Sequence, residues 1–344
     1  MLCIKHIELT EVIMGLLVNG QWQDKWYDTD KSGGKFVRED AHFRNWVTID
    51  GEAGPSGRAG FKAESGRYHL YVSMACPWAH RTLIFRKLKG LEPHIDVSVV
   101  HPDMLSEGWS FQGPELDSST PIGDALYQSS LYHELYTRAK SDYSGRVTVP
   151  VLWDKQQQTI ASNESAEIIR MFNSAFNDIT GNSADYYPEA LRAEIDAVNE
   201  RVYHNVNNGV YKAGFATTQG AYEEAFTALF ETLDWLEHRL SDQRFLAGNQ
   251  ITEADWRLFT TLVRFDAVYV GHFKCNLRRI ADYPNLQNYL RDLYQQPGIA
   301  ETVDMVHIKR HYYYSHRNIN PTGVVPVGPA LSLDAGHDRS RFER

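Results

Sequence analysis

The sequence YHLYVSMACPWAHRTLIFRKLKG, residues 68–90, predicts a strand that runs directly into a helix. Residues 68–74 are rich in aromatic and β-branched side chains, which is typical of a strand. Pro77 suits the first helical position, because its missing N–H needs no partner there. The apolar side chains that follow recur at helical spacing, and Gly90 closes the helix. We therefore expect Cys76 at the N-terminus of this helix.

The position predicted for Cys76 favours its thiolate, because unpaired backbone N–H groups and the positive end of the helix dipole stabilise an anion there. The thiolate is the nucleophilic form of cysteine. Ala79 replaces the second cysteine of a Cys-X-X-Cys motif. A lone thiolate cannot close an internal disulfide, so its natural partner is an external thiol. The alternative interpretation is a buried structural cysteine at a strand–helix turn.

Composition indicates a soluble, cytoplasmic protein. The 344 residues are enough for two domains, and 42% hydrophobic and 23% charged residues are typical of a soluble globular chain. No apolar run has the length of a membrane span, and the first residues contain no signal-peptide core. The three scattered cysteines fit a reducing compartment better than a disulfide framework. The net charge of −9 argues against a general nucleic-acid surface.

The motif Ala-Cys-Pro-Trp-Ala-His-Arg, residues 75–81, resembles the active-site motif of the Xi-class glutathione transferases, the glutathionyl-hydroquinone reductases. The likeness extends over residues 14–329, includes several further long motifs, and is greatest to the bacterial members. It implies an α/β thioredoxin-like domain that binds glutathione, followed by the all-α C-terminal domain of glutathione transferases. It also implies glutathione as co-substrate and assembly as a homodimer.

The order of the predicted elements divides the chain into two domains. Residues 61–180 have the strand and helix order of a thioredoxin-like domain, and residues 186–329 carry only helical stripes. Residues 14–60 show little periodicity, and the resemblance implies a coil that packs on the first domain. Residues 1–13 form an upstream extension without a predicted function, and residues 330–344 form a charged tail that we expect to be loose.

Two adjacent pairs of residues are predicted to hold glutathione. In thioredoxin-like folds the residue before a cis-proline offers backbone hydrogen bonds to an extended peptide, and Val149-Pro150 is placed for that role. Glu164 and Ser165 begin a helix, where a hydroxyl and free N–H groups can hold a carboxylate. The resemblance assigns this pair to the γ-glutamyl end of glutathione. Taken alone, Asn-Glu-Ser is an ordinary helix N-cap sequence.

The resemblance assigns two more glutathione contacts, Trp109 in the motif GWSF and Arg146. An arginine can pair with a carboxylate in bidentate fashion. The alternative for Trp109 is an anchor of the long polar insert, residues 101–140. The alternative for Arg146 is a solvated strand end.

Three tyrosines are the predicted active-site hydroxyls, again by resemblance: Tyr211, Tyr269 and Tyr312. Phenol groups can donate to or accept from a quinone oxygen and can steady a thiolate. We expect Tyr211 to be the proton donor, with Tyr269 and Tyr312 supporting the thiolate and positioning the ring. The alternative is that each tyrosine is a core or interface residue. Tyr312 is chosen over the two tyrosines that follow it by motif position only.

Histidines are numerous but lack the pattern of a metal site. His80, His307, His311 and His316 have no companion cysteine or acidic cluster, so we predict no metal. Cys275 has no helix-start context and is interpreted as a bystander.

The sequence thus predicts an enzyme that reduces glutathionyl-hydroquinones through a mixed disulfide between Cys76 and glutathione and releases glutathione disulfide. Its partners would be glutathione and glutathionylated hydroquinones, with neither nucleic acid nor membrane. One alternative is an Omega-like dehydroascorbate reductase or deglutathionylase, which lacks the role for the tyrosines. The other is a non-catalytic transferase-like binding module, in which the Cys76 thiol would be unreactive.

Overall fold

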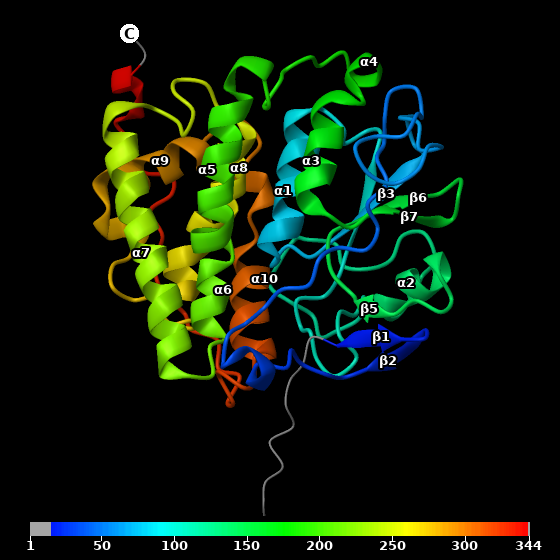
Figure 1. Ribbon diagram of the computed structural model, residues 1–344, viewed down its shortest axis with the longest axis horizontal. Coiled ribbons are helices and arrows are strands. Elements are labelled where there is room, and N and C mark those ends of the chain that lie inside the picture. The colour runs from blue at the N-terminus through cyan, green and yellow to red at the C-terminus, as the bar shows by residue number, and fades with distance from the viewer. Residues whose placement is uncertain (1–14, 343–344) are drawn as a thin grey trace, which may run out of the picture.

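The computed structural model describes residues 15–342, so the upstream extension, residues 1–13, lies outside the described residues. Figure 1 shows two halves side by side, one built around a sheet and the other made of helices. This arrangement confirms the predicted fold class, a thioredoxin-like α/β domain followed by an all-α domain. No helix in the described range is both long and apolar enough to cross a membrane.

The sheet of the first half has the strand order β4-β3-β6-β7. β3 pairs in parallel with β4 and antiparallel with β6, which pairs antiparallel with β7. All five residues of β3 are buried, which fits their aromatic and β-branched character. The elements of this half are β3 Tyr68–Val72, α1 Pro77–Leu88, β4 Asp96–Val99, α2 His133–Ala139, β6 Val151–Asp154, β7 Thr159–Ser162, α3 Ser165–Ser174 and α4 Asn177–Thr180.

Helix α1 begins directly after Cys76, as the sequence predicted. Cys76 is the N-cap residue in an extended conformation (φ −77°, ψ 122°), and Pro77 is the first helical residue. Gly90 follows the helix with a left-handed φ of +66°. α1 packs against α3 and also against α8 of the helical half, so the turn that carries Cys76 lies at the boundary between the halves (Figure 1).

The segment 14–60, expected to be a coil, carries a β-hairpin. β1 (Leu16–Val18) and β2 (Gln21–Gln23) pair antiparallel, and β1 also pairs with β5 (Gly145–Arg146). The Asn19-Gly20 loop has φ values of +50° and +76°, the backbone that a two-residue hairpin loop of this type requires. The Asn-Gly pair is a hairpin signal in the sequence, although its surroundings lack strand periodicity.

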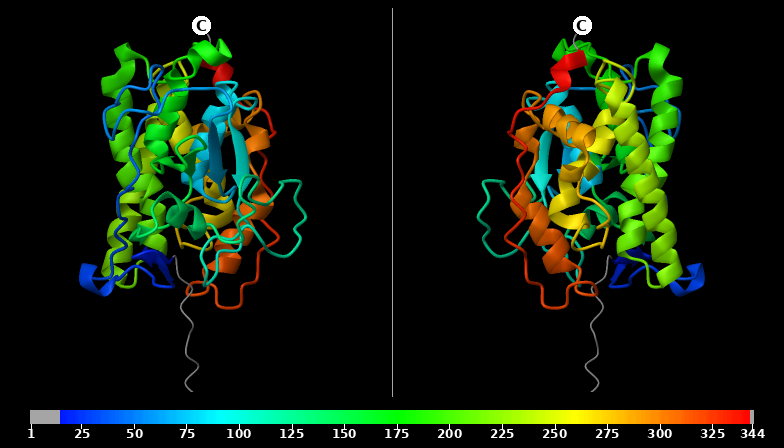
Figure 2. Two further views of the ribbon diagram at one scale, coloured as in Figure 1. Left: turned by 90° about the vertical axis from the view of Figure 1, so that its right-hand side faces the viewer. Right: turned by 90° about the vertical axis from the view of Figure 1, so that its left-hand side faces the viewer.

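The rest of this segment, residues 24–60, is here called the crossing segment. It crosses from the helical half to the sheet half along one face of the molecule (Figures 1 and 2). It contains the short turn η1 (Asp30–Ser32). Lys35 forms an ion pair of 2.7 Å with Glu224 of α7. Farther along, the Asn45 N–H donates to the carbonyl of Ala161 in β7 at 3.0 Å. The segment therefore covers part of the boundary between the two halves.

The helical half packs its longest helix, α7, against α6 and α9, and α8 lies fully buried between the halves. The described chain contains three π-helical turns, η3, η4 and η7, each of which directly follows an α-helix. The elements are η2 Glu189–Leu191, α5 Arg192–Val202, η3 Tyr203–Asn207, α6 Gly209–Gly214, α7 Gln219–Asp242, α8 Glu253–Arg264, η4 Phe265–Tyr269, η5 Ile280–Asp282, α9 Pro284–Tyr294, η6 Ala300–Thr302, α10 Met305–Arg310 and η7 His311–Ser315.

The charged tail is anchored, which corrects the expectation that it is loose. Arg339 in the short turn η8 (Arg339–Phe342) is fully buried. Its guanidinium donates to the carbonyls of Leu240 at 2.8 Å and Arg244 at 2.8 Å, at the end of α7. The carbonyl of Leu240 belongs to the last turn of α7, where carbonyls have no partner within the helix, and Arg244 lies just beyond the helix end; Arg339 binds both carbonyls and holds the tail in place.

Candidate active site

Cys76 stands where a substrate thiol could reach it. Its side chain is partly buried at the start of α1, and its Sγ lies 3.7 Å from the carbonyl oxygen of Val149. The Val149–Pro150 peptide bond is cis, as the sequence predicted from the fold. A cis-proline loop next to this cysteine leaves the backbone of Val149 available to an extended peptide.

Opposing influences act on the ionisation of Cys76. Burial raises the pKa of the thiol above its ordinary value. The backbone N–H groups of Ala79 and Trp78 at the start of α1, and the guanidinium groups of Arg38 and Arg264, lower the pKa but do not offset the burial. The helix start therefore stabilises the thiolate, while burial favours the neutral thiol.

Beside Val149 lies a narrow cavity, here called the glutathione cavity, whose wall includes most of the residues predicted to hold glutathione. Four of the five line it: Arg146, Val149, Glu164 and Ser165. Trp78, Asn163 and Tyr203 complete that side. Residues 38–42 of the crossing segment form another part of the wall. The sequence did not predict this wall, because the segment carries no motif that places it here.

The start of α3 and Arg146 both line this cavity. A carboxylate oxygen of Glu164 accepts a hydrogen bond of 2.9 Å from the N–H of Ala166, so Glu164 caps α3. Ser165 is the first helical residue and is buried. Arg146 donates to the carbonyl of Lys25 at 2.6 Å, and its guanidinium lies 4.1 Å from the ring centre of Tyr27. Arg146 is thus bound to the crossing segment and is not a solvated strand end.

Trp109 is the predicted glutathione contact that the structure does not bring to this cavity. Its indole is only 6% exposed and stacks on the ring of His311, with the ring centres 4.6 Å apart. Its carbonyl accepts a hydrogen bond from the N–H of Tyr132 at 2.9 Å. These contacts match the alternative role, an anchor of the polar insert, and a glutathione contact stays a prediction.

The three predicted tyrosines meet through their hydroxyl groups. The hydroxyl oxygen of Tyr312 lies 2.5 Å from that of Tyr211 and 3.1 Å from that of Tyr269. The hydroxyl of Tyr313 instead donates to the carbonyl of Ala267 at 3.3 Å. Tyr314 lies under the guanidinium of Arg310. The hydroxyl cluster therefore selects Tyr312 from the run of three tyrosines.

The π-helical turns bring these tyrosines together. Tyr269 and Tyr312 lie within η4 and η7, and Tyr211 follows η3 in α6. A π-helical turn shifts the side chains that follow it around the helix axis, and such turns are frequent at functional sites. Burial raises the pKa of Tyr269 to about 12 and raises the pKa of Tyr211 well above its ordinary value. In both, the nearby Cys76 thiolate adds to the rise in pKa, so the phenols stay protonated beside it.

Comparison with known proteins gives the family. Residues 75–175 match the family model "Glutathione S-transferase, N-terminal domain" and residues 219–292 match "Glutathione S-transferase, C-terminal domain". The glutathionyl-hydroquinone reductase YqjG of Escherichia coli is 60% identical over 328 residues, which cover 95% of this chain and 98% of YqjG. A glutathione-bound structure of YqjG superposes with a TM-score of 0.88 over 95% of this chain and 100% of that one, at 56% identity.

The class follows from a further structure. The Xi-class glutathione transferase of Natrialba magadii superposes with a TM-score of 0.86, at 46% identity, over 95% of this chain and 98% of that one. The present chain belongs to the Xi class of glutathione transferases. This confirms the resemblance seen in the motif around Cys76, and the chain is a member of an enzyme family.

Two residues of this Xi-class transferase were missed from the sequence. The guanidinium of Arg38 lies over the ring of Trp78, 4.3 Å from the ring centre, in the wall of the glutathione cavity. Arg264 is fully buried and donates to the carbonyls of Met74 and Ala75, both at 2.9 Å. Arg38 stands in a segment without periodicity. An arginine at the end of a helix is expected to be exposed to solvent and to interact with the negative end of the helix dipole. No sequence signal therefore marked Arg264 as a buried residue.

The remaining candidates do not line the glutathione cavity. Among residues 15–342 no group of three histidine, cysteine, aspartate or glutamate side chains could hold a metal ion. His80 contacts Arg264 at 3.0 Å and Thr302 at 2.7 Å. Cys275 is fully buried, and burial raises the pKa of its thiol, which suits a packing role.

Proposed function

We propose that this Xi-class transferase reduces glutathionyl-hydroquinones to hydroquinones, with glutathione as reductant and glutathione disulfide as the second product. The substrate class is supported by the 60% identity to a protein named glutathionyl-hydroquinone reductase. The chemistry is supported by one observation above all. A single thiol at a helix start, Cys76, lies beside the cis Val149–Pro150 loop and within electrostatic range of the phenols of Tyr211 and Tyr269.

Binding of the glutathionyl group uses the glutathione cavity. The backbone of Val149 pairs with the peptide backbone of the ligand, as a neighbouring strand would. The N–H and the hydroxyl of Ser165, the first residue of α3, receive the γ-glutamyl carboxylate. Arg146, held by the carbonyl of Lys25, supplies positive charge on the same cavity. Trp109 supports the site by packing the polar insert against His311.

In the first step the Cys76 thiolate attacks the glutathionyl sulfur. A sulfur–sulfur bond forms and the bond between sulfur and the ring carbon breaks, with its electron pair passing to the ring in a ketone-like tautomer. Cys76 is oxidised to a mixed disulfide, and the ring carbon is reduced and takes a proton. Tyr211 donates that proton, because its raised pKa keeps the phenol protonated until the ring becomes basic. Tyr312, hydrogen-bonded to both other phenols, supports the phenolate that results.

In the second step the thiolate of another glutathione attacks the glutathionyl sulfur of the mixed disulfide. Glutathione disulfide forms, and the electron pair of the broken bond returns to Cys76 as a thiolate. The guanidinium groups of Arg38 and Arg264, which lower the pKa of Cys76, stabilise this leaving group. No internal second cysteine is required.

The test is product analysis with purified protein, glutathione and a glutathionylated hydroquinone, beside a Cys76→Ser variant. We expect free hydroquinone and glutathione disulfide in equal amounts, and neither from the variant. Retained turnover in the variant contradicts the mechanism. Turnover of dehydroascorbate or protein mixed disulfides, with no hydroquinone released, points to the Omega-like activity. If none of these substrates is turned over, the non-catalytic binding module is the alternative that stands.

Tyr211 separates the proposed reaction from the Omega-like activity, since disulfide exchange alone needs no proton at a ring carbon. A Tyr211→Phe variant is expected to lose hydroquinone release and to keep disulfide exchange with glutathione. We also propose that the protein acts in the cytoplasm, where glutathione is reduced, and as a homodimer. Sedimentation of the purified protein tests the second point.

A further inference from the structure

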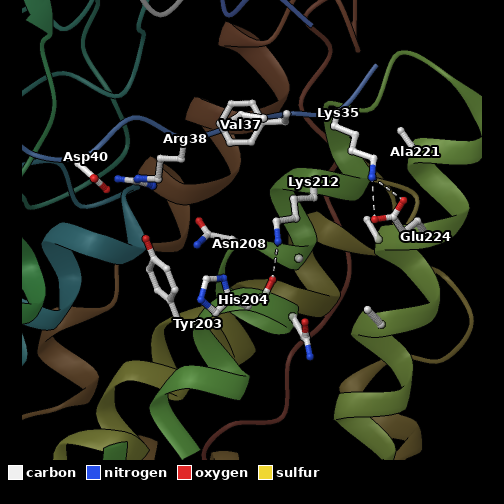
Figure 3. Close-up of a pocket in the computed structure, with 15 residues that line it drawn as sticks. Lys35, Val37, Arg38, Asp40, Tyr203, His204, Asn208, Lys212, Ala221 and Glu224 are labelled. Atoms are coloured by element: carbon white, nitrogen blue, oxygen red, sulfur yellow. Dashed lines mark hydrogen bonds and ion pairs between the residues drawn. The ribbon is translucent and has the colours of Figure 1, made fainter. Parts of the chain in front are cut away.

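A second cavity, of about 480 Å³, adjoins the glutathione cavity (Figure 3). Its volume lies within the roughly 300–1,000 Å³ that small-molecule sites occupy. The two cavities share Arg38, Asp40 and Tyr203 as a common wall. The second cavity is lined by the crossing segment, by η3 and α6, and by the first turns of α7. Phe36 and the alanines of α7 provide an apolar floor.

The charged side chains are spread along this cavity, with Lys212 between its two ends (Figure 3). At one end the ammonium of Lys35 pairs with Glu224 at 2.7 Å. Near it, the ammonium of Lys212 donates to the carbonyl of His204 at 3.1 Å. At the other end stand Arg38 and Asp40, beside the hydroxyl of Tyr203.

Two of these cations have no carboxylate partner. Within residues 15–342, neither Arg38 nor Lys212 forms an ion pair. Lys212 is half-buried, and a half-buried ammonium that bonds only to a backbone carbonyl is available to an anion. The cavity therefore presents two free positive charges and one free carboxylate, that of Asp40, around an apolar floor.

The common wall is close to the nucleophile. The ring of Tyr203 packs edge-on against Trp78, with ring centres 5.9 Å apart, and Arg38 covers Trp78. Trp78 is two residues from Cys76 in the first turn of α1. The positive charge of Arg38 also acts on Cys76, where it lowers the pKa of the thiol. A molecule in the second cavity that reaches past this wall meets the glutathionyl group bound to Cys76.

We propose that the second cavity binds the second glutathione, the one that cleaves the mixed disulfide. This inference rests on the proposed function, in which the first glutathionyl group still fills its own cavity when the second arrives. Glutathione carries two carboxylates and one ammonium, which match the free charges of Lys212, Arg38 and Asp40. Its sulfur attacks the glutathionyl sulfur, the bond to Cys76 breaks with its electron pair returning to Cys76, and the thiol proton of the incoming glutathione passes to water.

The experiment measures the two steps separately with the full-length protein. In the first, enzyme is mixed with one equivalent of glutathionyl-hydroquinone without free glutathione, and the burst of hydroquinone is followed. In the second, the isolated mixed disulfide is mixed with increasing glutathione, or with 2-mercaptoethanol, which has no carboxylate. The variant is Lys212→Gln, which keeps a donor for the carbonyl of His204 and removes the charge. The control is Lys140→Gln, which removes an equal charge from an exposed lysine that lines neither cavity.

We expect Lys212→Gln to lower the second-order rate constant for glutathione about tenfold, the effect of losing one charge-assisted hydrogen bond. Its hydroquinone burst and its reaction with 2-mercaptoethanol should equal those of the wild type, as should all rates of Lys140→Gln. An unchanged rate with glutathione, or an equal loss with both thiols, overturns the second site. Absence of the wild-type burst instead refutes the proposed function, so the two failures are distinguishable.

Discussion

Arg264 donates from its Nε to the carbonyl oxygen of Ala75 at 2.9 Å, so a fully buried guanidinium on α8 holds the residue directly before Cys76. The same group donates to the carbonyls of Met74 at 2.9 Å and Thr260 at 2.7 Å. Within residues 15–342 Arg264 has no carboxylate partner, and its charge lowers the pKa of Cys76. The helical half thus supplies both the position and part of the stabilisation of the thiolate.

Replacing Arg264 should affect the thiol and the fold in separable ways. Arg264→Gln removes the charge, so we expect a higher pKa of Cys76, measured by the ultraviolet absorbance of the thiolate against pH. Arg264→Lys keeps the charge and should raise that pKa less. Both variants leave buried carbonyls without donors and should lose about 2–4 kcal/mol in free energy of unfolding.

Arg81 provides the control for Arg264. It is also fully buried, lies on α1, and donates to the side-chain oxygen of Asn207 at 2.9 Å. Its guanidinium lies 4.5 Å from the ring centre of Trp78, but among the described residues it donates to no backbone carbonyl of the turn that carries Cys76. Arg81→Lys should therefore destabilise the protein with little change in the pKa of Cys76. An equal rise in that pKa in both lysine variants contradicts a specific role for Arg264.

Because Tyr312 bridges the other two phenols, its replacement by phenylalanine should slow hydroquinone release more than the same replacement of its neighbour Tyr313. Tyr312→Phe breaks both hydroxyl contacts, to Tyr211 and to Tyr269, and removes the group that stabilises the phenolate after proton transfer. We expect the single-turnover rate of hydroquinone release to fall at least about 100-fold, the lower range for general acid catalysis. Tyr313→Phe, which loses only its bond to the carbonyl of Ala267, should change that rate less than about threefold.

Much of this site could be predicted because it is local in the sequence. The strand, the proline and the helix around Cys76 are adjacent, so their geometry follows from backbone preferences. The hydroxyl cluster was predicted only by resemblance, since its three π-helical turns have no pattern that single-sequence periodicity detects. Arg38 and Arg264 are brought to Cys76 by long-range packing, and the fully buried Arg264 occupies a place where composition rules expect a hydrophobic residue.

Alkaline pH should destabilise the protein. Burial raises the pKa values of Cys76, Cys275 and the phenols of the hydroxyl cluster above their values in the unfolded chain. The folded state therefore binds more protons, and its stability is complete below the unfolded pKa of a thiol, about 8.5, and falls as pH rises above it. Urea unfolding from pH 7 to pH 10 measures this fall. A difference of one in pKa between the folded and unfolded states represents roughly 1.4 kcal/mol of stability. A Cys275→Ala variant removes one buried thiol, so its stability should fall less steeply, and equal slopes refute the assignment.

Substitutions of Trp109 test whether this residue contacts glutathione or only stabilises the fold. Its indole is 6% exposed, stacks on His311, and does not line the glutathione cavity. Trp109→Ala opens a large void beneath the insert and should lower the free energy of unfolding by about 3–5 kcal/mol. Trp109→Phe keeps a ring against His311, so it should lose less stability and leave the KM for the glutathionyl substrate unchanged. A KM that rises in Trp109→Phe while the unfolding free energy stays the same would instead show that glutathione contacts the indole, and that the insert moves when the ligand binds.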